Sequence, residues 1–380
     1  MYLKQLHLRS FRNYVDRQVK FTARKTILVG DNAQGKSNLL EAVELLASLK
    51  SHRTSRDREL VLDTASAGQI EAVVERTHSI NELSIIFRKQ GRRTVAVNRE
   101  TLRRQLDFLG VLNAVQFSSL DLDLVRGAPD TRRSWLDGLL IQLEPVYSSI
   151  LQQYNQVLRQ RSALLKKIRS LEQDESLETP ASLESQLRLW DEQLAAAGSR
   201  VARRRARVVA RLAPIARGWH KKISGETEQL EVNYLPNVLW AEDEPDKVRQ
   251  AFLAKIEERR VAERYQGKTV VGTHRDEIEF VINQTPARYY GSQGQQRTLV
   301  LALKLAELKL IEEVIGEPPL LLLDDVLAEL DLNRQQQLLE VIGDRFQTII
   351  TTTHIDSFNR DWVKDSQVLR IKAGEIITDW

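Results

Sequence analysis

The sequence has no cysteine, and this absence excludes two kinds of structure. Neither disulfide bonds nor thiolate metal sites can form, which fits a reducing compartment. The sequence also has no apolar run near the roughly 20 residues that a membrane-spanning helix needs. Its start, MYLKQLHLRSFRNYV, alternates polar and apolar residues like a strand and lacks the apolar segment of a signal peptide. We therefore expect a cytoplasmic protein with no membrane partner.

The chain has little excess charge of either sign. Lysine and arginine number 56 and aspartate and glutamate 52, which leaves a net charge of +4. A charge this small permits an acidic partner but does not require one. The 380 residues are 42% hydrophobic and 28% charged, which is enough for two domains or for one large α/β domain with an insertion.

A glycine-rich segment, KTILVGDNAQGKSNLLEAVELLASL, contains the pattern G-x-x-x-x-G-K-S from Gly30 to Ser37. A strand-like run precedes the pattern and a helical apolar pattern follows it, which is the context of a phosphate-binding loop and rare for a mere turn. Glycines let backbone N–H groups face an anion at the positive end of a helix. Lys36 would reach the β- and γ-phosphates of ATP, and the Ser37 hydroxyl would bind Mg²⁺. The expected nucleotide contacts are Gly30, Asp31, Asn32, Ala33, Gln34, Gly35, Lys36, Ser37 and Asn38.

Two aspartates follow a second apolar run, the four leucines of residues 320–323. Continuous apolar runs are typical of parallel strands that are buried on both faces. We expect Asp324 to bind the Mg²⁺ together with Ser37, and Asp325 to orient or deprotonate the attacking water. The alternative is that the two aspartates merely end a strand.

A further strand-like run, QTIITTTHID, ends at His354. A histidine at the carboxyl end of a strand can donate a hydrogen bond to a γ-phosphate. We therefore include His354 with Lys36 and Asp325 among the catalytic candidates, although a lone histidine is more often structural.

The stretch YYGSQGQQRT, residues 289–298, places small residues and amides ahead of a helical run. A second helix N-terminus able to bind phosphate is redundant within one chain, because the helix after the Gly30–Ser37 loop already holds the phosphates. It is useful if Ser292 and the backbone at Gly294 contact a γ-phosphate held by a second copy, so that a two-fold dimer encloses two ATP molecules. The alternative is an ordinary N-capped helix.

Together these stretches resemble an ABC-type ATPase of the SMC-like branch, and in detail the RecF family. The motifs that carry the resemblance are GDNAQGKS, GSQGQQ, LLLLDDVLAELD, TTTHID, HLRSFRNY, SHRTSRDREL, DLDLVRGAPDTRRSWLD and GTHRDEIEF. They are spread over most of the chain. Two segments, SSLDL and GTHRD, lack a proline that the family often has, and neither belongs to the nucleotide site.

The resemblance implies an ATP-dependent homodimer that acts in recombinational repair and replication restart with the mediators RecO and RecR. It implies weak, DNA-dependent ATP hydrolysis, which we expect to be slow because Asp325 is shorter than the glutamate of many ABC ATPases. It also implies that Arg12 and Arg56 lie near the nucleotide and that Gln116 is a metal-site glutamine. The implied signature is Ser292, Gln293, Gly294 and Gln295, and the implied D-loop residues are Glu329 and Asp331.

The predicted fold class is α/β. We expect an ABC-type P-loop ATPase lobe built from both chain ends, residues 1–115 and 271–380, with an inserted, mainly α-helical and basic lobe at residues 116–270. Three strand patterns between residues 68 and 100 predict an antiparallel set. Within the insertion, two helical patterns flank the acidic stretch EQDESLETP, which predicts an antiparallel helical hairpin.

The segment RVARRRARVVARLAPIARGWHKK, residues 200–222, has no acidic residue. It could be a solvated helix face. It could also bind the DNA backbone, because clustered arginines supply most non-specific affinity for DNA. We expect recognition of duplex or of a junction between single strand and duplex, without base reading. The candidate DNA contacts are Arg203, Arg204, Arg205, Arg207 and Arg211.

Three functions remain open at this point. The leading hypothesis is a DNA-binding ATPase whose ATP-bound dimer acts as a clamp. The first alternative is the nucleotide-binding subunit of a membrane transporter, against which the long helical insertion argues. The second is a scaffold with a structural nucleotide, against which the retained Lys36, Asp324, Asp325 and His354 argue.

Overall fold

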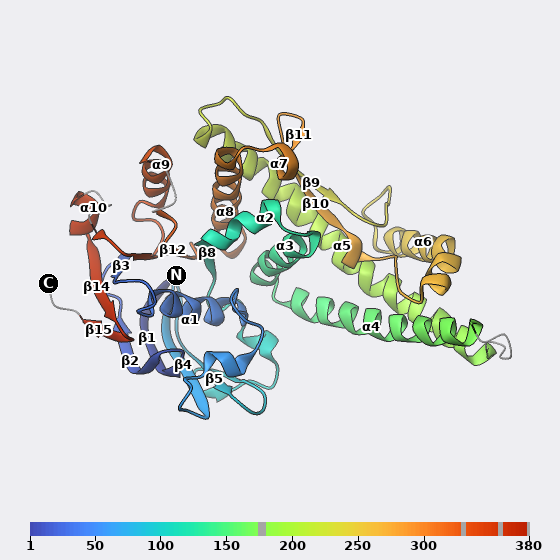
Figure 1. Ribbon diagram of the computed structural model, residues 1–380, viewed down its shortest axis with the longest axis horizontal. Helices are drawn as coiled ribbons and strands as arrows, with labels where there is room; N and C mark the ends of the chain where they lie inside the picture. The colour runs from blue at the N-terminus through green and yellow to red at the C-terminus, as the bar shows by residue number, and fades with distance from the viewer. Residues whose placement is uncertain (174–179, 328–331, 356–359, 378–380) are drawn as a thin grey trace. The chain divides into compact units, whose positions relative to one another are not determined.

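The computed structural model describes residues 1–173, 180–327, 332–355 and 360–377 (Figure 1). The chain forms two compact units. The first unit comprises Met1–Leu122, Gly218–Thr227 and Arg297–Trp380, and the second comprises Asp123–Arg217 and Glu228–Gln296. Both chain ends therefore belong to the first unit, and the second unit is inserted between them.

An antiparallel sheet of six strands lies in the first unit, in the order β2-β1-β4-β5-β6-β7. Along β1, Leu3, Leu6 and Leu8 are fully buried while the intervening side chains are more exposed, as expected for a sheet with one face on the core. The antiparallel set predicted between residues 68 and 100 is confirmed as β4, β5 and β6. The strands are β1 (Tyr2–Phe11), β2 (Tyr14–Lys20), β4 (Ala67–Arg76), β5 (Ser79–Arg88), β6 (Thr94–Val97) and β7 (Glu100–Thr101).

The second sheet of this unit has the order β15-β14-β3-β13-β12-β8. Its strands are parallel except β15, which pairs antiparallel with β14. The register sets Asp324 beside Thr351 and Ser118, and Thr352 beside Val29, so the carboxyl ends of β8, β12, β13 and β3 meet at one edge. The strands are β3 (Lys25–Val29), β8 (Ala114–Ser118), β12 (Leu320–Asp324), β13 (Thr348–Thr352), β14 (Ser366–Lys372) and β15 (Glu375–Ile377).

Helices complete the first unit. The long helix α8 begins in the second unit and is apolar around most of its circumference, which is typical of a helix buried on several sides. Within the described residues, no helix is long and apolar enough to cross a membrane. The helices are α1 (Lys36–Ser48), α8 (Gln293–Ile315), α9 (Leu332–Ile342), α10 (Arg360–Lys364) and the short 3₁₀ turns η1 (Asp57–Leu60), η2 (Gln105–Phe108) and η3 (Ser119–Leu122).

The second unit is mainly helical and also contains a small antiparallel sheet in the order β11-β10-β9. Helix α3 begins with a proline, a residue that favours the first helical position because it lacks an N–H. The elements are α2 (Asp123–Arg126), α3 (Pro129–Leu143), α4 (Val146–Glu172), α5 (Ala181–Ile223), β9 (Leu230–Leu235), α6 (Pro245–Gln266), η4 (Thr273–Arg275), β10 (Glu277–Ile282), β11 (Thr285–Pro286) and α7 (Ala287–Tyr290).

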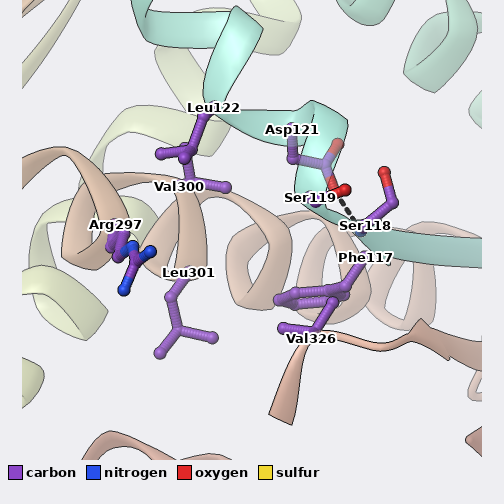
Figure 2. Close-up of a pocket in the computed structure, with 9 residues that line it drawn as sticks. All are labelled: Phe117, Ser118, Ser119, Asp121, Leu122, Arg297, Val300, Leu301 and Val326. Carbon is purple, nitrogen blue, oxygen red and sulfur yellow. Dashed lines mark hydrogen bonds between the residues drawn. The ribbon is translucent and has the colours of Figure 1, made fainter. Parts of the chain in front are cut away.

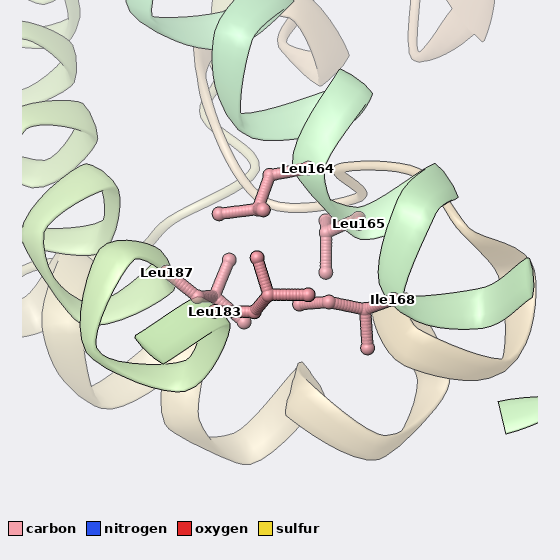
Figure 3. Close-up of a cluster of buried hydrophobic side chains, with 5 residues drawn as sticks. All are labelled: Leu164, Leu165, Ile168, Leu183 and Leu187. Carbon is pink, nitrogen blue, oxygen red and sulfur yellow. The ribbon is translucent and has the colours of Figure 1, made fainter. Parts of the chain in front are cut away.

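Helices α4 and α5 form the predicted antiparallel hairpin. Figure 3 shows leucine and isoleucine side chains near the end of α4 against leucines near the start of α5. Such a contact between the end of one helix and the start of the next requires the two helices to run in opposite directions. The middle of the acidic stretch between them, residues 174–179, lies outside the described residues. The buried side chains of this cluster are Leu164, Leu165, Ile168, Leu183 and Leu187.

The predicted lobe boundaries need correction. Residues 271–296 were expected in the ATPase lobe but belong to the second unit, because β10 pairs with β9 along its whole length. Residues 116–122 and 218–227 were expected in the insertion but belong to the first unit. Strand β9 had no clear sequence signal, so its pairing partner was assigned to the wrong lobe.

Candidate nucleotide site

The loop after β3 has the conformation that its two glycines allow. Gly35 has φ 115°, and a β-carbon there would lie 2.7 Å from the side chain of Asn13. At Gly30, a β-carbon would lie 2.3 Å from the carbonyl oxygen of Ile371. Neither position has space for a side chain, and Gly35 also has a backbone angle that favours glycine.

Lys36 opens α1 and folds back over this loop. Its ammonium group donates to the carbonyl oxygens of Gly30 (2.7 Å) and Asp31 (3.0 Å), and the residue is 4% exposed. The charge is thus held in the concave side of the loop at the N-terminus of a helix. This is the position from which a lysine can reach the phosphates of a nucleotide.

Asn13 and Tyr14, at the turn between β1 and β2, hold the loop from one side. The Asn13 amide donates to the carbonyl oxygen of Gln34 (3.0 Å), and the Asn38 amide donates to the Asn13 side-chain oxygen (2.8 Å). The buried Tyr14 hydroxyl donates to the carbonyl oxygen of Gly35 (2.9 Å). These two residues were not predicted, because only the folded chain brings them to the loop.

The turn between β14 and β15 holds the loop from the other side. The backbone N–H of Ala373 donates to the side-chain oxygen of Gln34 (2.7 Å), and that of Gly374 donates to its carbonyl oxygen (3.0 Å). The Gln34 side chain is therefore engaged with this turn. Its predicted nucleotide contact stays a prediction, which the Gln34 backbone N–H could still make.

Ser37, Asp324 and Thr351 form the centre of the site. The Ser37 and Thr351 hydroxyls each donate to the same carboxylate oxygen of Asp324, both at 2.8 Å. Thr351 was not predicted; the register that pairs it with Asp324 was the missing information. Hydroxyl and carboxylate oxygens side by side are donors that suit Mg²⁺, which usually takes one or two carboxylates together with phosphate oxygens and water. Among the described residues no cluster of three or more histidines and carboxylates offers a complete protein cage for a metal.

Asp325 follows the strand in a left-handed conformation, with φ 54°. Its backbone N–H donates to the Thr351 hydroxyl at 2.9 Å, which fixes the turn. Burial raises the pKa of the Asp325 carboxyl above its ordinary value, and Lys36 opposes this shift while Asp324 adds to it. A non-glycine residue in this conformation is uncommon and is found preferentially at functional sites.

His354 lies just beyond β13, at the same sheet edge as Asp324 and the phosphate loop. His354 is exposed, and its backbone N–H donates to the Thr352 hydroxyl at 3.2 Å. The Thr352 hydroxyl in turn donates to the His354 carbonyl oxygen at 2.9 Å. The predicted catalytic histidine is thus placed at the edge that carries the site.

Gln116 is not at this edge. It lies inside β8 opposite Leu322, two residues before Ser118, which is level with Asp324. Both of its amide atoms are buried and have no hydrogen-bond partner in the described part of the chain. Its predicted role as a metal-site glutamine stays a prediction.

A small pocket adjoins the end of β8 (Figure 2). Its volume of about 40 Å³ holds a few water molecules but not a nucleotide. The backbone N–H of Ser118 donates to the Asp121 carboxylate at 2.6 Å, and Asp121 also pairs with Lys304. The lining residues are Phe117, Ser118, Ser119, Asp121, Leu122, Arg297, Val300, Leu301 and Val326.

The arginines predicted near the nucleotide have different environments. Arg12 donates from two nitrogens to the buried carboxylate of Glu41 in α1, at 2.8 and 2.6 Å, so it braces this helix. Arg56 is exposed and forms a 3.6 Å ion pair with Glu59. Arg53, which the sequence analysis missed, donates to the side chain of Asn38 at 2.5 Å and so reaches the phosphate-loop helix.

The predicted signature forms the N-terminus of α8. The backbone N–H of Gln295 donates to the Ser292 hydroxyl (3.2 Å), and the backbone N–H of Ser292 donates to the Gln295 side chain (2.8 Å). This reciprocal pair is a capping box, so the N-cap interpretation is confirmed within one chain. Ser292 and Gln293 remain exposed. The stretch belongs to the second unit, whereas the phosphate loop belongs to the first.

The predicted D-loop residues Glu329 and Asp331 lie outside the described residues.

The basic segment of α5 is largely paired with acidic side chains. Arg203 and Arg207 both donate to the Asp243 carboxylate, at 2.5 and 2.6 Å. Arg204 donates to Glu144 at 3.0 Å. Arg211 is exposed, and no partner for it is found in the described part of the chain.

Arg205 is buried, and its predicted DNA contact is wrong. The side chain is 3% exposed and donates two hydrogen bonds to Asp137, both at 2.9 Å. Its remaining nitrogen donates to Asp276 (3.0 Å) and to the carbonyl oxygen of Thr273 (2.7 Å). Arg205 thus joins α3, α5 and the segment before β10 inside the second unit.

The fold and this site define an ABC-type P-loop ATPase of the SMC-like class. The protein family described as RecF/RecN/SMC N terminal domain matches residues 2–374. Within this class, the chain belongs to the RecF family. The DNA replication and repair protein RecF of Gloeothece citriformis is 69% identical over 381 residues, which cover 99% of this chain and 99% of that protein. The RecF protein of a Synechocystis species is 63% identical over 380 residues, covering 100% and 99%.

Solved structures agree with this assignment. A structure described as the recombination mediator protein RecF-ATP in the RecFOR pathway has a TM-score of 0.89 and 32% identity, and the match covers 100% of this chain and 98% of that one. An SMC head domain from Pyrococcus furiosus has a TM-score of 0.53 at 15% identity, covering 99% and 96%. The latter likeness concerns the fold alone.

Proposed function

We propose that this chain is an ATPase of recombinational DNA repair and replication restart that acts as an ATP-controlled DNA clamp. Two copies would enclose two ATP molecules, each held by the phosphate loop of one copy and the signature of the other. ATP binding would close the dimer on DNA, and slow hydrolysis would open it. RecF relatives described as DNA replication and repair proteins and as members of the RecFOR pathway support this function.

One observation carries the dimer in this proposal. Ser292 lies exposed at a helix N-terminus in one compact unit, while the Gly30–Ser37 loop lies in the other. An exposed helix N-terminus attracts anions through its free N–H groups and its dipole. A second copy can supply such an anion as a γ-phosphate, and two-fold symmetry then completes both sites at once.

Within each site the residues would divide the chemistry as follows. Lys36 would exchange its loop carbonyl contacts for the β- and γ-phosphates. Ser37 and Asp324 would hold Mg²⁺, which when bound neutralises charge on the phosphates. Asp325 would accept a proton from the attacking water and His354 would donate to the γ-phosphate. Gln116, which lies two residues before the strand end, is the proposed metal-site glutamine.

The pH dependence of turnover tests the assignment of Asp325 as the base. The carboxyl must be ionised to accept a proton, and burial raises its pKa above the ordinary value of 3.8. Turnover is therefore expected to fall on acidification through an apparent pKa above 3.8, measured as kcat against pH. Asp325→Asn is expected to lose about 100-fold or more in kcat together with this acidic limb. An unchanged limb in Asp325→Asn contradicts the assignment.

DNA would be bound through its backbone in this proposal. Arg211 is available directly, and Arg203, Arg204 and Arg207 could exchange exposed carboxylates for phosphates. Such contacts make affinity fall with salt through counterion release, without sequence preference. RecR and RecO are the proposed partners, and the cytoplasm and nucleoid the proposed location.

The dimer is tested by substituting Ser292. Arginine there would add bulk and charge where the γ-phosphate of the other copy must lie. Light scattering is expected to show that ATP doubles the molar mass of the wild type and leaves Ser292→Arg monomeric. Binding of a fluorescent ATP analogue to monomeric Ser292→Arg is expected to stay within about threefold of wild type, because the phosphate loop lies in the other unit.

The matched control is Ser185→Arg, an exposed serine of α5 in the same unit. It is expected to dimerise like the wild type. If ATP also doubles the mass of Ser292→Arg, the signature does not contact the nucleotide of the second copy. The stretch is then only the helix cap that its hydrogen bonds form within one chain.

A further inference from the structure

A pocket in the second unit, beside α7, is not used by the proposed ATPase chemistry. Its volume is about 160 Å³, and all its lining residues belong to the second unit. Strand β10 forms one wall, and the short segment β11–α7 that leads to the signature forms another. The residues that matter below are Val125, Arg132, Glu279, Phe280, Arg288 and Tyr289.

The pocket combines a buried apolar surface with an exposed aromatic ring. Val125 and Phe280 are 1% and 5% exposed, whereas Tyr289 is 72% exposed. The Arg288 guanidinium lies over the Tyr289 ring, 5.4 Å from its centroid. Tyr290, the next residue, is 73% exposed, and its ring centroid lies 6.4 Å from that of Tyr289. An exposed tyrosine ring with an arginine beside it offers a flat surface for another planar group.

The charged side chains of the pocket differ in whether the described residues supply a partner of opposite charge. Arg132 donates to the Glu277 carboxylate at 2.7 and 2.8 Å, so these two residues neutralise each other. The neighbouring carboxylate on the same strand, Glu279, has neither a hydrogen bond nor an ion pair among the described residues. It is only partly buried and remains available as a hydrogen-bond acceptor.

We propose that this pocket binds a nucleobase that carries an exocyclic amino group. The ring would stack on Tyr289 next to Arg288, and the amino group would donate to the Glu279 carboxylate. Stacking on aromatic side chains is the main way in which proteins bind unpaired bases. A carboxylate accepts well from base amino groups, as it does from cytosine N4. The pocket has about the size of one base.

The base could come from either of two sources. One source is the ATP held by a second copy, since Tyr289 precedes Ser292 by three residues and three residues span at most about 11 Å. This distance lies within the length of a nucleoside triphosphate, and this source rests on the proposed ATP-enclosing dimer. The other source is an unstacked base of bound DNA, which needs no dimer.

The DNA source is tested with single-stranded oligonucleotides of equal length and fixed salt. One carries adenines, one thymines, and one abasic sites, so all have the same phosphates. Fluorescence anisotropy is expected to show about tenfold tighter binding of the adenine strand than of the abasic strand. Tyr289→Ala is expected to lose this preference. Glu279→Ala is expected to lose the smaller preference for adenine over thymine, which has no amino group.

The nucleotide source is tested by the ATP concentration at which light scattering shows half-maximal dimerisation. Tyr289→Ala is expected to raise this concentration about tenfold, while binding of ATP to the monomer stays unchanged. The matched controls are Tyr265→Ala, an exposed tyrosine on α6, and Glu231→Ala, an exposed glutamate on β9. The unfolding temperature of every variant is measured alongside.

The outcomes separate the two hypotheses. A change in one assay alone supports the pocket and identifies its source. If wild type does not dimerise with ATP, the proposed clamp fails, and the DNA assay still decides whether the pocket binds a base. The inference is overturned if Tyr289→Ala and Glu279→Ala give the same results as Tyr265→Ala and Glu231→Ala in every assay in which the wild type responds. No base then binds in this pocket.

Discussion

Asp324→Asn is expected to lower ATP turnover by about 100- to 1,000-fold, the usual loss when one group that stabilises transition-state charge is removed. Asparagine has nearly the same shape, and its side-chain oxygen can still accept from Ser37 and Thr351, so the fold is retained. What is lost is the negative charge that would hold Mg²⁺ beside the phosphates. Steady-state phosphate release and the binding of a fluorescent ATP analogue are the measurements.

A matched control for this variant is Asp63→Asn, which changes an exposed aspartate of the same unit outside the site. Its turnover is expected to equal that of the wild type. Nucleotide affinity of Asp324→Asn is expected to fall much less than turnover, because Lys36 and the loop N–H groups still bind phosphate. A turnover within tenfold of wild type would mean that Asp324 does not hold the metal.

Arg205→Met is expected to lower the free energy of unfolding by about 3 to 5 kcal/mol, the usual cost of removing one partner of a buried ion pair. Methionine fills part of the volume but leaves the carboxylates of Asp137 and Asp276 buried without their cation. Urea denaturation followed by circular dichroism measures the loss. The control is Arg211→Met on the same helix, where an exposed arginine is expected to contribute less than about 0.5 kcal/mol.

The loss in Arg205→Met is also expected to depend on pH. Burial already raises the pKa of Asp276 in the folded protein, and Arg205 is the main group that opposes this shift. Without the arginine, the pKa of Asp276 in the folded protein rises further. The loss of stability caused by Asp276 is therefore absent at pH values below its pKa in the unfolded chain. It is complete at pH values above its pKa in the folded protein. Destabilisation is therefore expected to be smaller at about pH 5 than at about pH 8. An equal loss at both values would mean that Asp276 stays paired in the variant.

The features that could be predicted from the sequence are those that a local pattern of residues determines. The phosphate loop, the buried strand before Asp324 and the helical hairpin were all found, because each depends on neighbours along the chain. Ser37 and Asp324, which were expected to share a Mg²⁺, lie within hydrogen-bond distance of each other.

What the sequence could not predict depends on partners that are distant along the chain. Arg205 and Arg211 look alike within one basic segment, yet one is buried against two carboxylates and the other is exposed. Their difference is set by Asp137 and Asp276, which belong to other elements. The contact of the Gln34 side chain with Ala373 could not be predicted for the same reason, because Ala373 lies 339 residues further along the chain.

The contacts of Gln34 also have a consequence for how the protein is made. The phosphate loop is held by Asn13 on one side and by Ala373 and Gly374 on the other, and β3 lies between β13 and β14. A ribosome completes the loop early, but the turn that holds one side of it follows 339 residues after Gln34. The nascent chain therefore cannot bind nucleotide with its final loop geometry until Ala373 and Gly374 have emerged. Truncated products of interrupted translation that lack this turn would also lack the final geometry of the phosphate loop.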